Sequence, residues 1–139
     1  MATDGAGLLF GAAPAFTAPV LGDTARVMSL SELTGQDTVI LFVRPTDSAS
    51  ELDKQLSASV HGLRERGRLC VVCCGGLRDC QSLLPEIQVG LHNVGDVPIL
   101  LDTDEAIARL FQVKRTPVAF HLNSEAHIVS VGRQQSSTS

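Results

Sequence analysis

The hydrophobic and polar positions of the chain fall into blocks that alternate between strand length and helix length. Residues 38–44 form a continuous β-branched and apolar run, which is typical of a strand buried on both faces. Residues 48–66 follow a helical period, and their apolar positions recur at steps of four, four and three: Leu52, Leu56, Val60 and Leu63. This region therefore predicts a buried strand that leads into an amphipathic helix.

The start of that helix carries residues suited to capping. Asp47 or Ser48 is predicted as the N-cap, because either side chain can accept a hydrogen bond from a backbone N–H that has no partner within the helix. Glu51 follows Ser48 by three residues, which is the spacing of a capping box. Gly67 is predicted to end the helix.

The remainder of the chain continues the alternation. Further strands are predicted at residues 69–74, 97–101, 118–122 and 128–131, and shorter helices at residues 77–84 and 104–111. We expect Pro85 to disturb the continuation of the first short helix, and Asp102 or Thr103 to cap the second. The order β-α-β-α-β-α-β-β predicts an α/β protein with a central mixed sheet flanked by helices.

Length and composition fit one folded domain. The chain has 139 residues, of which 44% are hydrophobic and 19% charged, and this balance excludes a disordered or fibrous protein. We expect a flexible N-terminal arm at residues 1–12, the domain at residues 13–132 and a disordered tail at residues 133–139. The net charge of −4 and the absence of Trp and Tyr argue against a nucleic-acid partner.

Nothing in the hydropathy indicates a membrane partner. The longest apolar runs, such as residues 39–43, are far shorter than the ~20 residues of a membrane-spanning helix. Residues 1–11 contain no Lys or Arg, unlike the start of a secretory signal. The sequence therefore predicts a cytoplasmic location.

The four cysteines, Cys70, Cys73, Cys74 and Cys80, lie within eleven residues of one another. This clustering argues against a disulfide framework, and the simplest interpretation is that these cysteines are small buried core residues. Cys70 and Cys73 have the spacing of a zinc-ligand pair, but on a strand they would point to opposite faces. We therefore predict no metal and no cofactor, although a metal chaperone using the Cys70–Cys80 cluster remains a third hypothesis for the function.

Cys80 is the best candidate for a reactive thiol. It falls near the start of the predicted helix 77–84, where the helix N-terminus and Arg78 would both lower the pKa of its thiol. Cys74 is the candidate partner of Cys80 in a redox reaction. The alternative is that Cys80 is a partly buried helix residue that takes part in no reaction.

Three stretches carry a resemblance to a known family: residues 13–33, which open with Ala13-Pro14-Ala15-Phe16, residues 39–46 with their buried run, and residues 108–120, which contain Thr116-Pro117. In their order and spacing they resemble the thioredoxin-like superfamily, in its peroxiredoxin and thiol-disulfide oxidoreductase branch (AhpC/TSA and TlpA/MauD-like proteins). The resemblance implies that Pro117 is cis and faces the start of the first long helix. In the family, that helix begins with the active cysteine.

The sequence departs from the family at that position. One alignment places Asp47 and Ser50 where the family has its paired cysteines, and a shifted alignment places Ser48 and Glu51 there. The peroxiredoxin pattern fails as well, because it would require a cysteine at Leu52. A hydroxyl nucleophile would need an adjacent base, and no histidine lies near in sequence.

These observations favour a non-catalytic thioredoxin-like domain that binds a protein or another ligand. The residues predicted to form the binding corner come from the two loops at the start of the first long helix and before Pro117: Arg44, Pro45, Thr46, Asp47, Ser48, Ser50, Arg115, Thr116 and Pro117. With Lys114 beside them, we expect this corner to be locally basic and to suit an acidic partner segment. The alternative function is a thiol redox enzyme or sensor using Cys80.

Family members end in a helix that covers one face of the sheet, whereas only polar residues follow Val131 here. We therefore expect a bare apolar sheet face that is covered by a second copy of the chain or by another protein partner. The alternative is that the N-terminal segment Leu8–Phe10 folds over this face instead.

Overall fold

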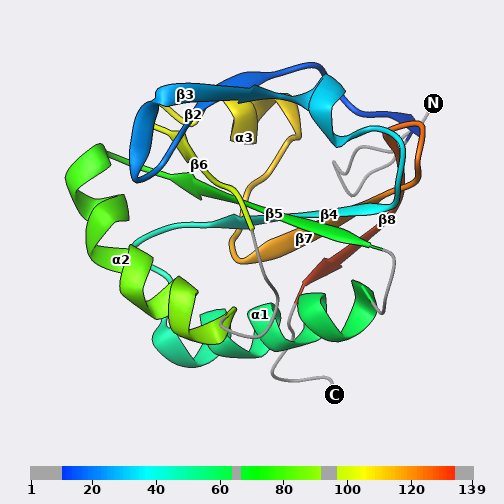
Figure 1. The fold of residues 1–139 in the computed structure, drawn as a ribbon. Coiled ribbons are helices and arrows are strands. Elements are labelled where there is room, and N and C mark those ends of the chain that lie inside the picture. Colours follow the sequence, from blue (N-terminus) through cyan, green and yellow to red (C-terminus); the bar gives the residue numbers. More distant parts are fainter. Residues whose placement is uncertain (1–10, 64–66, 92–96, 134–139) are drawn as a thin grey trace.

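Three parallel strands form the middle of a single eight-stranded mixed sheet (Figure 1). The computed structural model describes residues 11–63, 67–91 and 97–133. The strands are β1 (Gly11–Ala12), β2 (Thr17–Val20), β3 (Asp23–Ser29), β4 (Thr38–Val43), β5 (Arg68–Cys74), β6 (Ile99–Asp102), β7 (Val118–Leu122) and β8 (His127–Arg133). Their order across the sheet is β1-β8-β7-β4-β5-β6-β2-β3.

The helices are α1 (Ala49–Leu63), α2 (Leu77–Gly90) and α3 (Ala106–Leu110), with a short 3-10 helix, η1 (Leu30–Leu33). Helices α1 and α2 cover one face of the sheet, and α3 lies on the other side with the hairpin β2–β3 (Figure 1). The predicted α/β class, with its central mixed sheet and flanking helices, is confirmed.

The alternation of side chains along the central strands produces two apolar cores. Leu41 and Val43 of β4 point towards α1 and α2, whereas Ile40 and Phe42 point towards α3. On the α3 side, Phe42 packs against Phe111 and Phe120 with ring centroids 5.2 and 5.5 Å apart. Because both faces of β4 are buried, its whole sequence is apolar or β-branched, which explains why residues 38–44 were recognisable as a strand.

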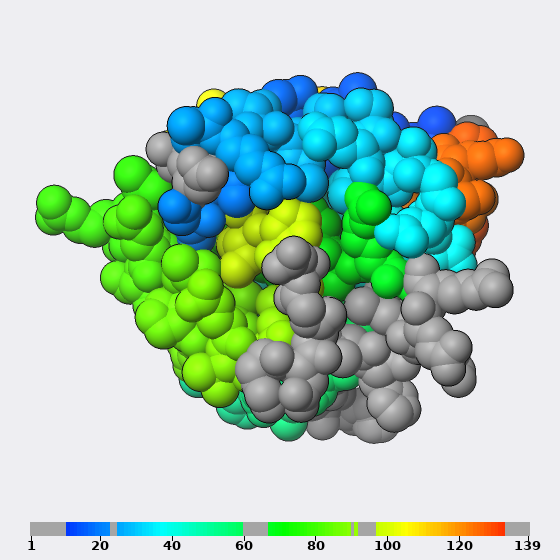
Figure 2. All heavy atoms as spheres, in the orientation of Figure 1, coloured from blue at the N-terminus to red at the C-terminus, as the bar shows by residue number. Residues whose placement is uncertain are grey.

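The N-terminal strands were not predicted from the sequence. β2 pairs with β6 at the edge of the parallel strands, and β3 pairs with β2. In the space-filling view, these residues and η1, in blue and cyan, form a continuous layer over the upper part of the molecule (Figure 2). Residues 11–12 of the predicted arm pair with β8, and Arg133 of the predicted tail ends β8. The other arm and tail residues lie outside the described part of the chain.

Pro85 does not end α2, contrary to the prediction of a helix over residues 77–84. The helix continues to Gly90 with Pro85 inside it. Pro85 lacks the N–H that would bond to the preceding turn, but Ile87 and Leu91 beyond it are buried in the core beneath α1 and α2. This packing holds the second half of the helix in place despite the missing hydrogen bond.

The sheet face beside α1 is small or polar where it continues onto β7 and β8. Ala119 and His121 of β7 lie opposite Gly132 and Ser130 of β8 on this side. Ala119 is buried, His121 is half-buried and Ser130 is exposed. The bare apolar surface expected here is therefore not formed by these described residues, because the outward positions hold His, Ser and Gly; a homodimer or protein partner on this face stays a prediction. Within the described ranges, no helix combines the length and apolarity needed to cross a membrane.

Candidate functional site at the start of α1

Asp47 joins two loops at the carboxyl end of β4. Its Oδ2 accepts a hydrogen bond of 2.8 Å from the backbone N–H of Arg44, and its own N–H donates to the Arg44 carbonyl at 3.0 Å. Its Oδ1 accepts a 2.7 Å hydrogen bond from the hydroxyl of Thr116. The carboxylate thus closes the turn that precedes α1 and connects it to the loop before β7.

Ser48, not Asp47, caps α1. The Ser48 hydroxyl oxygen accepts a 3.1 Å hydrogen bond from the backbone N–H of Glu51, at the capping-box spacing predicted from the sequence. Asp47 is one residue too early in the chain, and both of its oxygens already have partners. The N-cap of α3 is Glu105 rather than the predicted Asp102 or Thr103. Asp102 still binds the start of the helix, because its two oxygens accept hydrogen bonds from the N–H groups of Ile107 and Ala108 at 3.1 and 2.9 Å.

Arg44 is bound to Glu105 rather than directed at a ligand. Its Nη2 and Nε donate to the two carboxylate oxygens of Glu105 at 2.9 and 3.3 Å. This hydrogen bonding lowers the pKa of Glu105, although burial acts in the opposite sense. The charge of Arg44 is therefore balanced within the protein, and any basic character of this region has to come from the exposed Lys114 and Arg115.

Burial raises the pKa of Asp47 above its ordinary value. The hydrogen bonds from Thr116 and from the Arg44 backbone act against this effect, because both stabilise the charged carboxylate. Asp47 is half-buried, whereas Thr46, Ser48 and Ser50 are exposed. The structure therefore brings the predicted residues into one corner, in which Asp47 joins the loops and the hydroxyls face solvent.

The loop before β7 completes the corner, which we define as residues 44–50 and 114–117. The peptide bond between Thr116 and Pro117 is cis, as the resemblance implied. Pro117 is buried and Lys114 and Arg115 are exposed. Among the described residues, no backbone hydrogen bond ties residues 114–116 to the rest of the chain.

All four cysteines lie in the described part of the chain and all are buried thiols. Cys70 and Cys74 belong to the core on the α3 side, whereas Cys73 and Cys80 belong to the core beneath α1 and α2. Burial raises the pKa of every one of them, that of Cys70 to about 12. The sequence predicted a lowered pKa for Cys80, but its side chain has no exposed surface, and burial outweighs the effect expected from the helix N-terminus and Arg78.

The split of the cysteines between two faces also bears on the metal hypothesis. Cys70 and Cys74 point away from Cys73 and Cys80, so the four sulfurs do not surround one point. Across the described residues, no group of three or more His, Cys, Asp or Glu side chains could hold a metal ion.

Comparison with solved structures shows which fold the chain has. The chain superposes on the thioredoxin domain of a thiol-disulfide oxidoreductase from Bacteroides vulgatus with a TM-score of 0.71 at 17% identity, covering 91% of each chain. It superposes on a secreted Mycobacterium tuberculosis disulfide oxidoreductase, homologous to E. coli DsbE, with a TM-score of 0.66 at 15% identity, covering 87% of this chain and 84% of that one. The chain has a thioredoxin-like fold. A putative thioredoxin from Neisseria meningitidis gives a TM-score of 0.66 at 18% identity over 90% of this thioredoxin-like chain and 81% of that protein.

These identities are low, so they establish the fold of the thioredoxin-like domain alone. The sequence matches no family model and no curated protein. What the domain does therefore has to be argued from its own residues.

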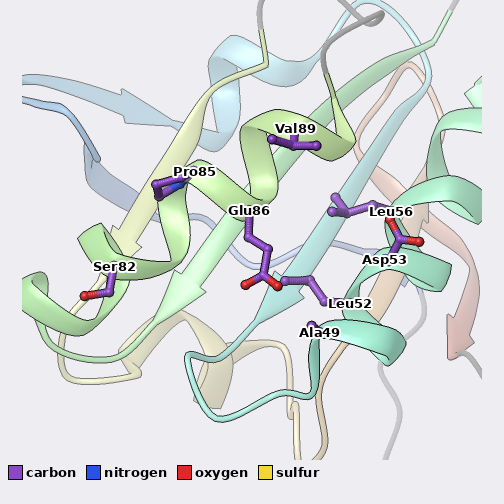
Figure 3. Close-up of a pocket in the computed structure, with 8 residues that line it drawn as sticks. All are labelled: Ala49, Leu52, Asp53, Leu56, Ser82, Pro85, Glu86 and Val89. Atoms are coloured by element: carbon purple, nitrogen blue, oxygen red, sulfur yellow. The ribbon is translucent and has the colours of Figure 1, made fainter.

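The structure contains a groove between α1 and α2 that the sequence patterns did not predict (Figure 3). Its volume is about 590 Å³, and Leu52 and Leu56 are the buried residues among those that line it. Glu86 extends from α2 towards Leu52 of α1, and Asp53 lies on the α1 side (Figure 3). The exposed Val89, at 72%, was the available signal, but it lies beyond Pro85, where the predicted helix had ended.

Proposed function

We propose that this thioredoxin-like domain is a binding module whose corner holds an extended, acidic segment of a partner protein, and that the start of α1 does not perform thiol-disulfide exchange. The observation that carries the proposal is the hydrogen bond from Thr116 to Asp47, which fixes the two corner loops against each other. A fixed pair of loops is a suitable platform for a ligand, because little conformational entropy is lost when the ligand binds.

The residues at the start of α1 support a binding role over a catalytic one. No cysteine occurs among residues 44–51. The carboxylate of Asp47 is engaged by Arg44 and Thr116, and the hydroxyl of Ser48 caps the helix. These side chains therefore already serve the structure of the corner, and a thiolate nucleophile is missing from the loop.

The loop before Pro117 supports an extended ligand. The peptide groups of residues 114–116 have no backbone partner among the described residues, so a second extended segment can pair with them as an added strand. Lys114 and Arg115 are exposed, whereas Arg44 is balanced by Glu105. Two positive charges beside an unpaired backbone favour an acidic segment, with an attraction that salt should weaken.

The test is a titration of the ¹⁵N-labelled full chain with two synthetic peptides that alternate Val with Glu or Val with Lys. We expect the Val-Glu peptide to shift the amide signals of Arg115, Thr116 and residues 46–50, and to bind more weakly as salt increases. The Val-Lys peptide should bind at least several-fold more weakly.

The charge-reversal variant Arg115→Glu should lose binding of the Val-Glu peptide. Arg78→Glu is the matched control, because Arg78 is also exposed but lies on α2. The proposal is contradicted if the shifted signals map to the groove between α1 and α2, or if the two variants weaken binding equally.

A further inference from the structure

The thiols of Cys73 and Cys80 lie close enough together to affect each other's pKa. Cys73 lies near the end of β5 and Cys80 lies in the first turn of α2, and the connection between these elements passes through Gly75 and Gly76 (Figure 1). Both side chains belong to the core beneath α1 and α2, and neither has any exposed surface. Two neighbouring thiols on the same side of the sheet can form a disulfide once a local movement brings their sulfurs together.

The sheet separates this pair from the other cysteines. Cys74 follows Cys73 in the same strand, so its side chain points to the opposite face, into the core that contains Cys70. Cys80 therefore shares its core with Cys73 and not with Cys74, which the sequence had suggested as its partner.

Irregular chain lies beside the sulfur of Cys80. A methyl group placed on Gly75 would lie 3.8 Å from the sulfur of Cys80 and 3.3 Å from Cδ of Pro45, so Gly75 lies between these two side chains. Pro45 belongs to the loop before α1, and Gly75 has a φ of +149° in the turn before α2. Because neither residue is part of a helix or strand, a local opening at this place can expose Cys80 while the sheet remains intact.

The place of Cys80 beside irregular chain distinguishes it from Cys73. A methyl group on the turn residue Gly75 would lie 3.8 Å from the Cys80 sulfur, whereas Cys73 belongs to a central strand. A local opening of the turn therefore exposes Cys80 first. Since burial raises the pKa of both thiols, oxidation should be slow at neutral pH and faster in alkaline solution.

We propose that Cys73 and Cys80 are a redox site, separate from the binding corner, which a small hydroperoxide converts into an intramolecular disulfide. Cys80 gives its proton to solvent, and its sulfur attacks one peroxide oxygen. An S–O bond forms, the O–O bond breaks, and the leaving hydroxide takes up a proton to become water.

The sulfur of Cys73 then attacks the sulfenic sulfur of Cys80. The S–S bond forms, the S–O bond breaks, and the departing hydroxide leaves as a second water with the proton of Cys73. In sum, two thiols and one hydrogen peroxide give one disulfide and two waters. Two electrons pass from the sulfurs to the peroxide oxygens.

The test uses the full chain and hydrogen peroxide, followed by denaturation, alkylation of the remaining thiols and mass spectrometry. We expect a loss of about 2 Da and alkylation of two cysteines instead of all four. Trypsin cleaves after Arg78, which lies between Cys74 and Cys80, so the oxidised protein should give a peptide pair joined through Cys80. Fragmentation should place the other end of the bond at Cys73.

Three variants control the assignment. Cys73→Ala and Cys80→Ala should each abolish the linked peptides, whereas Cys70→Ala, on the same strand but the opposite face, should retain them. Peptide mapping of the oxidised chain without substitutions identifies the linked cysteines even if a variant fails to fold. The proposal is overturned if oxidised protein contains no bond between residues 73 and 80, or if the linkage to Cys80 persists in Cys73→Ala.

Discussion

The hydroxyl of Thr116 donates a 2.7 Å hydrogen bond to Asp47, a residue 69 positions earlier in the chain. Thr116 precedes the cis peptide bond at Pro117, and Asp47 precedes the N-cap of α1. One side-chain contact therefore connects the two loops that form the corner.

Thr116→Val should weaken this connection at nearly constant shape. The valine cannot donate to the half-buried carboxylate of Asp47, and hydrogen bonds to charged groups contribute more than neutral ones. We expect the free energy of unfolding to fall by about 1–2 kcal/mol in urea denaturation. Thr116→Ser keeps a hydroxyl and should retain most of the stability; equal losses in both variants would show that the hydrogen bond is not the cause.

The arrangement of the elements was predictable where one strand or helix carries its own periodic signal. β4 is apolar or β-branched because both of its faces are buried, and the stripe of α1 includes Leu52 and Leu56, which the structure buries. The prediction failed for β2 and β3, which are short or have exposed positions, and Pro19 within β2 lowered the strand signal further. The predicted end of the helix before Pro85 was wrong for a different reason. The burial of residues beyond Pro85 outweighs the free-energy cost of the missing backbone hydrogen bond.

The corner and the thiol pair show the limit of local patterns. Asp47 and Thr116 were predicted to belong to one site because the sequence resembles a known family. The hydrogen bond between them depends on how β4 and β7 pair. Cys80 was singled out from its place near a helix start, yet its contact with Cys73 depends on the face to which each strand position points. Contacts of this kind follow from strand register and helix placement, which no local period encodes.

His121 should make the protein less stable as the pH falls from 7 towards 5. Burial lowers the pKa of His121 below 6.5, so between that lowered value and 6.5 the unfolded chain binds more protons than the folded one. The stability is fully present above the ordinary pKa and is lost as the pH decreases through this window. His121→Gln should flatten the dependence of the urea midpoint on pH, whereas His127→Gln, at an exposed position, should not.

Glu105 adopts a left-handed conformation with a φ of 60° at the start of α3. Glu105→Gly and Glu105→Ala both remove the ion pair with Arg44, but glycine adopts this conformation without the steric cost that alanine meets. We expect Glu105→Gly to be about 1 kcal/mol more stable than Glu105→Ala in urea denaturation. The same two substitutions at the exposed Glu125 should show no advantage for glycine; an equal advantage there would remove the conformational explanation.

Pro45 should limit the oxidation of Cys80, because its ring lies against Gly75, the turn residue beside the Cys80 sulfur. Pro45→Ala removes most of the ring, should make the turn easier to open and should speed the appearance of the disulfide with hydrogen peroxide several-fold. Thr46→Ala is the matched control, since Thr46 is exposed in the same loop. Unchanged rates in Pro45→Ala would mean that peroxide reaches the thiol pair by another route.

Ser59 of α1 is a site at which a polar group can be removed with a gain in stability. It has 2% of its surface exposed, and its hydroxyl has no hydrogen-bond partner within the described part of the chain. A buried hydroxyl without a partner loses its hydrogen bonds to water on folding and forms none within the protein. Ser59→Ala should therefore raise the free energy of unfolding. The exposed Ser57 lies on the same helix, and Ser57→Ala gains only the higher helix propensity of alanine. Urea denaturation should show Ser59→Ala to be about 1 kcal/mol more stable than Ser57→Ala. A gain no larger than that of Ser57→Ala would indicate that the Ser59 hydroxyl is bonded after all.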